Sequence, residues 1–351
     1  MVYLLMFIYI IIYSYLVEFN TKKMWEFIIL FIPISILLIM ILGLQKDVGT
    51  DYQTYISLAD DSKGLGWIEG RGEIFFVLLV LFVKMLKIPQ FIFVVVAIIQ
   101  VFFLMLICYE VEKLSFKLYH FFFLYFALSL TFFNQFNGIR QYISVYIIVY
   151  ALLKFIDNKK ILYIVLVLFA SLFHYSSIYF LIILPFKRIL KKRFSTKIII
   201  AIMVILFAIS NLNLSRYIEI LLSYTDYRSY VGSSYFGRTS IQGIITKVPK
   251  LIIVLISAYI INKNNLNEKE IQLINLSYIA CGVQILSFAS TLIWRFYQYV
   301  DLLIIFPVLI LFNNKLEKDF RILISICLFV MLIIKIIVLP RGEYLYNSIL
   351  F

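Results

Sequence analysis

Long apolar runs, separated by short polar loops, repeat along almost the whole chain. The runs are 12 to 23 residues long, and 64% of the 351 residues are hydrophobic. A bilayer core of about 30 Å needs about 20 apolar residues per helix, so the pattern predicts an all-α, polytopic transmembrane protein. Because no Pro/Gly/Ser-rich linker interrupts it, we expect residues 1–351 to form a single integral membrane domain.

The hydropathy pattern divides into 13 apolar segments, and we therefore expect about 12–13 membrane segments. Several are short for a full crossing, which predicts broken or re-entrant helices among them. The first run lacks the features of a cleaved signal peptide and is interpreted as a retained span. The segments are 2–17, 25–44, 73–88, 91–109, 119–134, 142–156, 161–173, 175–186, 197–212, 244–262, 271–293, 296–312 and 321–339.

The net charge of +13 resides largely in the short loops between these segments. Cytoplasmic loops of membrane proteins retain Lys and Arg, which explains the charge without a nucleic-acid partner. The dense basic loop 187–197 is the clearest cytoplasmic marker. Counting spans outward from it places FNGIRQ (136–141), His174, segment 213–243 and Trp294–Tyr297 together on the outer side.

The amino-terminal third fits this count only if one apolar segment does not cross. We assign that exception to 73–88, which carries Lys84 and Lys87, so that 45–72 becomes an outer loop. The alternative, with 45–72 inside, stays open.

Polar residues in FNGIRQ lie between two long apolar segments. Arg at the centre of a bilayer span costs about 2.5–3.5 kcal/mol on insertion scales, so such a residue usually has a function. The planar fork of Arg140, flanked by Asn137 and Gln141, suits a phosphate or diphosphate. A helix-end Arg that reaches the interface is the structural alternative.

Loop 45–72 combines carboxylates and phenols in the pattern of a sugar-binding surface. Asp51, Tyr52 and Tyr55 offer hydrogen bonds and aromatic faces. Arg71 and Glu73 follow at the start of the next segment, where ion pairing at a helix end is the simpler explanation. An ordinary solvated loop is the alternative for the whole segment.

Other candidates lie in the later outer segments. His174 in LFHYSS has a reference pKa near 6.5, which suits a general base, although an interhelical hydrogen bond is the alternative. Segment 213–243 alternates Arg, including Arg238, with Tyr, which suits an anionic sugar-lipid or an interfacial helix. Arg295 and Tyr297 place further polar groups at an outer helix end.

The sequence contains no pattern that predicts a metal or cofactor site. Cys108, Cys281 and Cys327 lie in apolar stretches without a CxxC, and no P-loop, GxSxG or HExxH occurs. We expect neither a metal nor a cofactor.

Five motifs in this order resemble the EpsG family, within the Wzy-type polysaccharide polymerases. One departure is that Ile74 and Phe75 follow Glu73, where the family pattern has Pro or Gly. The motifs are GTDYQTY (49–55), EIFF (73–76), FNGIRQYIS (136–144), LFHYSS (172–177) and RFYQY (295–299).

The resemblance implies a GT-C-like polymerase of the bacterial cytoplasmic membrane with its active site facing outward. Such an enzyme joins undecaprenyl-diphosphate-linked oligosaccharide units of a capsule, exopolysaccharide or O-antigen. A chain-length regulator and a flippase of the same pathway are further expected partners. On this hypothesis His174 removes the acceptor proton with Asp51 as substitute or orienting partner, and Arg140, Arg238 and Arg295 neutralise the leaving diphosphate.

Three other functions fit many spans and an Arg-rich outer face. A flippase for the same lipid-linked sugar is the main rival, although it predicts charges deep in central helices and two related halves. An O-antigen ligase would share the donor chemistry, and a membrane acyltransferase would need a cytoplasmic acyl donor.

Overall fold

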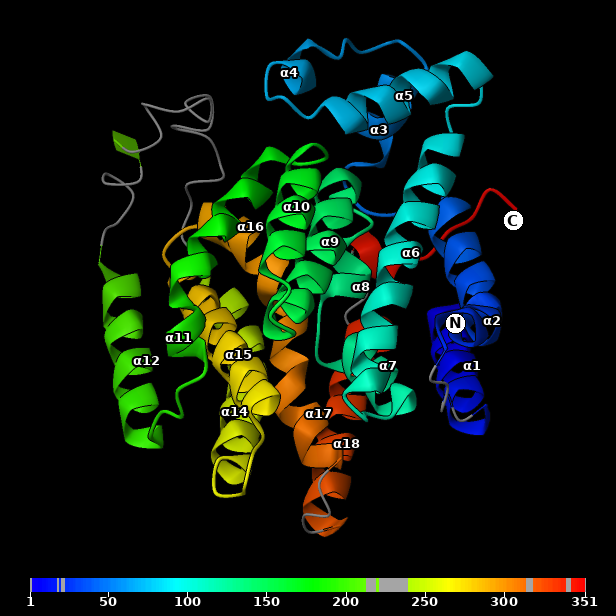
Figure 1. Cartoon of the computed structure of the whole chain (residues 1–351). Coiled ribbons are helices and arrows are strands. Elements are labelled where there is room, and N and C mark those ends of the chain that lie inside the picture. The colour runs from blue at the N-terminus through cyan, green and yellow to red at the C-terminus, as the bar shows by residue number, and fades with distance from the viewer. Residues whose placement is uncertain are drawn as a thin grey trace. The chain divides into compact units, whose positions relative to one another are not determined.

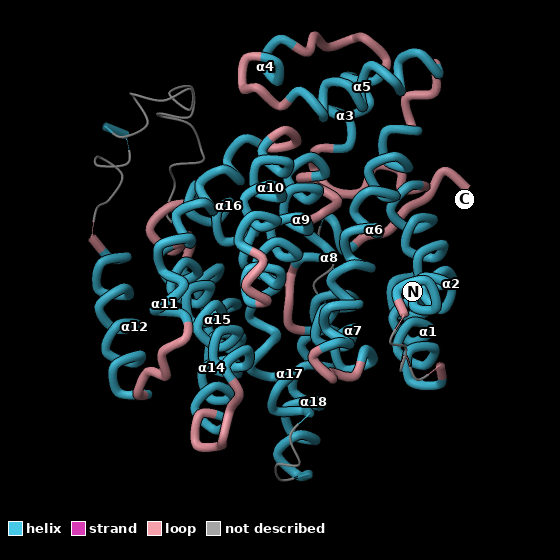
Figure 2. Tube along the Cα trace, in the orientation of Figure 1, coloured by secondary structure: helices cyan, strands magenta, loops and turns pink. Residues whose placement is uncertain are grey.

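The computed structural model describes residues 2–17, 19, 23–212, 219–220, 239–313, 318–338 and 342–350. Every named element in these ranges is a helix, and the only extended pairing among them is an isolated bridge between Gln45 and Ser348 (Figures 1 and 2). The all-α class predicted from the apolar runs is confirmed, and all 13 segments coincide with helical elements.

Five helices in the described residues are long and apolar enough to cross a membrane. They are identified by their length and apolar composition. An α-helix can cross lipid because its backbone hydrogen bonds are formed within the helix. The chain is therefore a polytopic membrane protein. The five are Met24–Gly43, Phe91–Lys113, Ile139–Ile156, Thr291–Asn313 and Lys318–Ile337.

The helices group into two compact units, residues 1–182 with 317–351 and residues 183–316. The single membrane domain predicted from the sequence stays a prediction.

Helix α9 (Ile139–Ile156) is the centre of the first unit. Its neighbours are α6 (Phe91–Lys113) and α10 (Lys160–Ser171). Of its 18 residues, 94% are buried. A helix that is apolar all round is buried on every side, which explains this central position. Gln100 of α6 donates to the Ile139 carbonyl at 3.0 Å and ties the two helices at the start of α9.

The other helices of the first unit surround this centre. α2 packs on α6, while α1 and α18 pack on α7. Their bounds are α1 Val2–Leu16, α2 Met24–Gly43, α7 Leu118–Ala127, α8 Thr131–Asn134, α18 Lys318–Ile333, η5 Ile334–Val338 and η6 Gly342–Tyr344. The boundary between the two units falls within the 3₁₀ helix η1 (Tyr175–Phe186).

Three short helices lie across the end of α6 near its first residue (Figure 1). They are α3 (Tyr52–Ala59), α4 (Gly66–Glu69) and α5 (Ile74–Leu86), so the predicted outer loop 45–72 contains two helices of its own. The 13 residues of α5 rise about 20 Å, less than the hydrocarbon thickness of about 30 Å. That this segment does not cross the membrane stays a prediction, as does its outward orientation.

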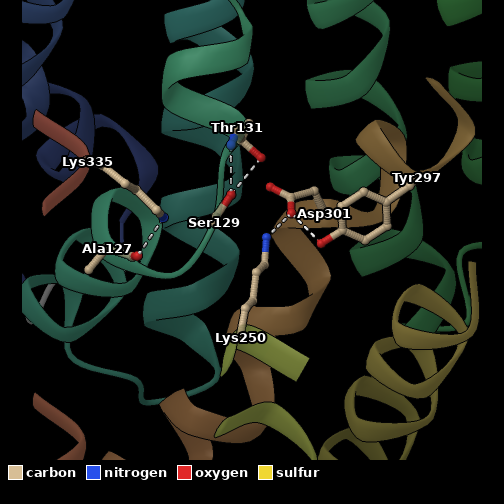
Figure 3. Close-up of polar contacts among 7 residues, drawn as sticks. All are labelled: Ala127, Ser129, Thr131, Lys250, Tyr297, Asp301 and Lys335. Carbon is tan, nitrogen blue, oxygen red and sulfur yellow. Dashed lines mark hydrogen bonds and ion pairs between the residues drawn. The ribbon is translucent and has the colours of Figure 1, made fainter. Parts of the chain in front are cut away.

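One apolar segment of the first unit that was predicted as continuous is broken. Segment 119–134 divides into α7 and α8, because the Ser129 hydroxyl accepts the Thr131 backbone N–H at 3.0 Å and competes with the helix (Figure 3). At the same break Lys335 donates to the carbonyl of Ala127, the last residue of α7. A cation is favourable at a helix carboxyl terminus, so the break carries its own cap.

In the second unit α15 contacts α11, α12, α14, α16 and α17, so the other helices assemble around it. Segment 296–312 was predicted as one helix, but a 3₁₀ turn, η4 (Asp301–Ile304), separates α16 from α17. Segment 271–293 likewise ends early at Leu286. The bounds are α11 Lys187–Leu190, α12 Thr196–Asn211, α14 Ile241–Ile261, α15 Glu268–Leu286, α16 Thr291–Val300 and α17 Ile305–Asn313.

Candidate functional site

Three helix ends of the first unit meet at one point. They are the start of α5, the start of α9 and the end of α10, which carry Glu73, Arg140 and His174 respectively. The Phe75 amide donates to the Leu172 carbonyl at 3.0 Å. A first-turn N–H and a last-turn C=O both lack partners within their own helices, so this bond joins α5 to α10.

The Glu73 carboxylate is the hub of the site and is completely buried. One oxygen pairs with Arg140 Nη1 at 2.5 Å. The other lies 3.2 Å from His174 Nδ1 and accepts the Tyr175 backbone N–H, also at 3.2 Å. A buried carboxylate is tolerated only when it is paired and hydrogen-bonded, and Glu73 meets both conditions.

These contacts decide the protonation of Glu73. Burial alone raises the pKa of this carboxyl, but the hydrogen bond from His174 and the charge of Arg140 outweigh it and hold the pKa below its usual value. Glu73 is therefore ionised over the whole neutral range.

Arg140 occupies the first turn of α9, where the helix dipole disfavours a cation. The Glu73 carboxylate offsets this, and the Arg140 side chain is only 9% exposed. The Tyr55 phenol lies near the first turn of α9, where the charge and the backbone N–H of Arg140 both favour its ionised form. Burial is the main reason why the pKa of Tyr55 rises to about 12.

The Glu73 contact orients the His174 imidazole. In a neutral ring, the nitrogen facing a carboxylate carries the proton, which leaves the lone pair on the other nitrogen. His174 Nδ1 faces Glu73, so Nε2 is the basic nitrogen. A histidine held by a carboxylate in this way has the arrangement of a general base.

Asn137 joins the FNGIRQ motif to the segment Gly49–Tyr52, called the GTDY loop below. Its Oδ1 accepts the Thr50 backbone N–H at 2.6 Å, and its Nδ2 donates to Glu343 at 3.2 Å. Gly49 has φ of +77°, and a Cβ there would lie 2.2 Å from Asn137 Oδ1. Glycine is therefore required at position 49, both for the turn and for this close approach.

The remaining predicted residues of the GTDY loop divide between packing and the site. Tyr52 stacks on Phe93 with ring centroids 4.8 Å apart and donates to Gln90 at 2.7 Å, so its phenol anchors α3 on α6. Tyr55 contacts Arg140, and Asp51 lies close enough to Tyr55 to affect its pKa. Tyr55 and Asp51 therefore belong to the neighbourhood of Arg140, whereas Tyr52 belongs to the core.

The other predicted site residues lie in several places, and not all of them belong to the first unit. Gln141 is mostly buried beside Arg140 in α9, and Arg71 is half-buried ahead of Glu73. Arg295 and Tyr297 belong to α16 in the second unit. Arg238 lies outside the described residues.

A second buried charge cluster lies within the second unit (Figure 3). Lys250 of α14 forms an ion pair with Asp301 at the start of η4, and Tyr297 donates to the same carboxylate at 2.5 Å. All three side chains are at most 4% exposed. The sequence does not reveal this cluster, because Lys250 and Asp301 are 51 residues apart in the chain.

Sequence reasoning missed three residues that hold the sites together. Gln90 donates to the carbonyls of Gly43 and Gln45, and Glu343 bonds to Asn137. Lys250 was hidden within an apolar segment. The only available signal was the presence of isolated polar residues in apolar surroundings, which does not reveal their partners.

No group of three or more His, Cys, Asp or Glu side chains within the described ranges is arranged to hold a metal ion. Cys108 and Cys281 are buried thiols without a disulfide partner in the structure.

A family model covers residues 28–348 of this chain, which span every element of the Glu73 site. The model is that of the EpsG family. The chain belongs to the EpsG family.

EpsG membership implies a polysaccharide polymerase-type role in exopolysaccharide synthesis. The match includes the GTDY loop, the start of α9 and Glu343 near its end. Neither curated proteins nor solved structures gave a match. The GT-C likeness therefore stays a prediction.

Proposed function

We propose that this EpsG-family protein polymerises undecaprenyl-diphosphate-linked oligosaccharide units on the outer leaflet of the bacterial cytoplasmic membrane. The family gives the polymerase-type role, and the substrate and its leaflet are the proposed part. The observation that carries the proposal is the buried pair of Glu73 and His174. In this pair His174 Nδ1 faces the carboxylate, which leaves Nε2 as the basic nitrogen.

The reaction transfers a growing glycan from its diphosphate carrier to a sugar hydroxyl of the incoming unit. The hydroxyl oxygen forms a bond to the anomeric carbon, the bond from that carbon to the diphosphate oxygen breaks, and the hydroxyl proton passes to His174 Nε2. Glu73 holds the imidazole and stabilises the cation that forms. The departing carrier keeps the bonding electron pair as undecaprenyl diphosphate.

Charge stabilisation of the departing diphosphate falls to arginines in this proposal. Arg140 is already paired with Glu73, so its first role is to hold that carboxylate, and the positive end of the α9 helix dipole is the remaining favourable field for an anion at this point. Arg238 and Arg295 are proposed to bind the diphosphate, with Arg71 and Gln141 as further binding residues. Tyr297, also a binding candidate from the sequence, is buried and donates its hydroxyl to Asp301, so it takes no part in this proposal. Asp51 and Tyr55 are proposed for the sugar side, with Asp51 as substitute or orienting partner of His174, whereas the phenol of Tyr52 is held by Gln90 and is left to packing.

The decisive experiment removes the gene and locates the lipid-linked units by leaflet, using mass spectrometry with a membrane-impermeant glycosidase. Single units accumulating on the outer leaflet, without polymer, support a polymerase. Units retained on the inner leaflet indicate a flippase instead, and polymer that forms but is not transferred to its final acceptor indicates a ligase.

Complementation then tests the residues. A His174→Gln copy is expected to insert normally and to leave single units unpolymerised. His120→Gln is the matched control, because His120 is the second histidine of the chain and lies in α7. Polymer of normal length from His174→Gln would contradict the assigned base.

A further inference from the structure

An apolar groove of about 310 Å³ lies in the second unit between α11, α12 and α15. The side chains on α12 include Ile202, Met203 and Leu206, and those on α15 include Ile279 and Leu286. Residues 189, 190 and 194 of the connecting segment complete it. The groove belongs to a membrane protein but is not part of the Glu73 site, which is built from first-unit residues alone.

Two polar features shape the groove. Asn275 of α15 donates through Nδ2 to the carbonyls of Leu190 at 2.7 Å and Lys192 at 2.8 Å. Its donor group is thus consumed in fixing the connecting segment against α15. At Gly282 a Cβ would lie 2.9 Å from Leu206, so the absence of a side chain lets α12 approach α15 closely. The remaining lining is almost entirely hydrocarbon.

One margin of the groove is built from the basic segment 187–197. Leu190 and Phe194 line the groove, whereas the residues between and beside them carry positive charge. Lys191 pairs with Glu268 at 2.9 Å, and Arg193 donates to Asn262 at 2.9 Å. Arg188 and Lys192 are exposed and have no acidic partner among the described residues.

We infer that this groove binds an anionic phospholipid, with an acyl chain along α12 and α15 and the phosphate at Arg188 and Lys192. A hydrocarbon-lined groove takes a lipid chain, and a basic rim selects the anionic headgroup over a zwitterionic one. The positive charge of segment 187–197 predicts that it faces the cytoplasmic leaflet, where anionic lipids meet basic segments. The inference goes beyond the polymerase proposal, since it assigns a site for a lipid that is not consumed.

The test uses the full-length protein purified in detergent and exposed to equimolar phosphatidylglycerol and phosphatidylcholine vesicles. Lipid retained after re-isolation is identified by native mass spectrometry. Phosphatidylglycerol is expected to be retained in preference. Ile202→Trp, which fills the groove, is expected to lose most of it, whereas Val204→Trp is the control, since Val204 is exposed on α12 but does not line the groove.

The rim is tested separately. Arg188→Gln or Lys192→Gln is expected to lower the preference for phosphatidylglycerol about five-fold, since each basic residue near an anionic surface contributes about that factor. Lys160→Gln, a matched charge removal in the first unit, is expected to leave it unchanged. Equal retention of both lipids, retention unaffected by Ile202→Trp, or preferred retention of a polyprenyl phosphate would each overturn the inference. None of these results depends on whether the protein polymerises glycans.

Discussion

The two buried charge clusters differ in how their charges balance. Lys250 and Asp301 form a pair of one cation and one anion, with Tyr297 donating to the anion. Around Glu73 one carboxylate meets a permanent cation, Arg140, and a histidine. The Lys250 cluster thus holds one cation against one anion, whereas the Glu73 cluster adds an imidazole, a group whose ordinary pKa lies near neutral pH.

The two clusters also differ in where their residues lie along the helices. Asp301 lies at the junction between α16 and η4, so Lys250 fixes a break inside a transmembrane segment. Glu73, Arg140 and His174 lie at the ends of three helices, next to the polar GTDY loop. Buried pairs often contribute structural specificity rather than stability, while charge next to a polar loop is accessible to chemistry. We therefore interpret the Lys250 cluster as structural and the Glu73 cluster as functional.

The largest expected effect separates the two clusters by activity. His174→Gln is expected to lower the polymerisation rate by about 100- to 10,000-fold, the usual contribution of a general base. Lys250→Met combined with Asp301→Leu is expected to leave the rate of the folded protein within about ten-fold of the parent. The measurement is polymer formed per folded protein in reconstituted vesicles. Comparable losses in both variants would remove the distinction drawn here.

The next effect concerns stability in the second unit. Lys250→Met alone leaves the buried Asp301 carboxylate without its cation and is expected to cost about 3–5 kcal/mol. The double change Lys250→Met with Asp301→Leu removes both charges and is expected to recover most of this loss. Thermal unfolding in detergent measures both. A double variant as unstable as the single one would show that the pair itself, rather than the uncompensated charge, matters.

A smaller effect tests the contact between the GTDY loop and the start of α9. Gly49→Ala introduces a Cβ that would lie 2.2 Å from Asn137 Oδ1, in addition to strain at φ of +77°. A strained backbone position of this kind costs about 1–3 kcal/mol. Gly72→Ala is the control, since its φ is +72° but no atom lies within 4 Å of the added Cβ. The same loss of stability and activity in both variants would argue against a functional contact at Asn137.

The smallest effect is a pH dependence. The lowered pKa of Glu73 means that its stabilising contribution is complete above the ordinary glutamate value of 4.5 and is lost as the pH falls through the lowered value. The melting temperature of the parent is therefore expected to fall more steeply below pH 4.5 than that of Glu73→Gln. Parallel melting curves across that range would show that Glu73 is not held ionised by its neighbours.

The sequence predicted the fold class well and the helix interruptions poorly. Each of the 13 apolar segments coincides with helical elements, because burial in lipid demands apolar side chains over a helix length, whereas the short helices α3, α4 and α11 lie outside those segments. Hydropathy did not locate the breaks at Ser129 and at Asp301. A break depends on whether a side chain captures a backbone group, and a single residue leaves almost no trace in an average over a window.

The sequence predicted residues of the candidate site but not the contacts between them. Arg140, His174 and Glu73 were selected individually, Glu73 as a substrate-binding residue with a helix-end ion pair beside Arg71 as the simpler alternative. The structure pairs it instead with Arg140 and His174. The expected free fork of Arg140 is thus partly occupied, which turns its first role from binding a phosphate to holding a carboxylate.

By itself the sequence determined that this chain is a helical membrane protein of the EpsG family, because apolar length and short ordered motifs are local properties. Only the tertiary structure decided which polar residues meet. Tyr175, the residue next to His174, donates to the Glu73 carboxylate across a separation of 102 residues. Contacts over such distances follow from how α5, α9 and α10 pack, and packing is a property of the whole unit.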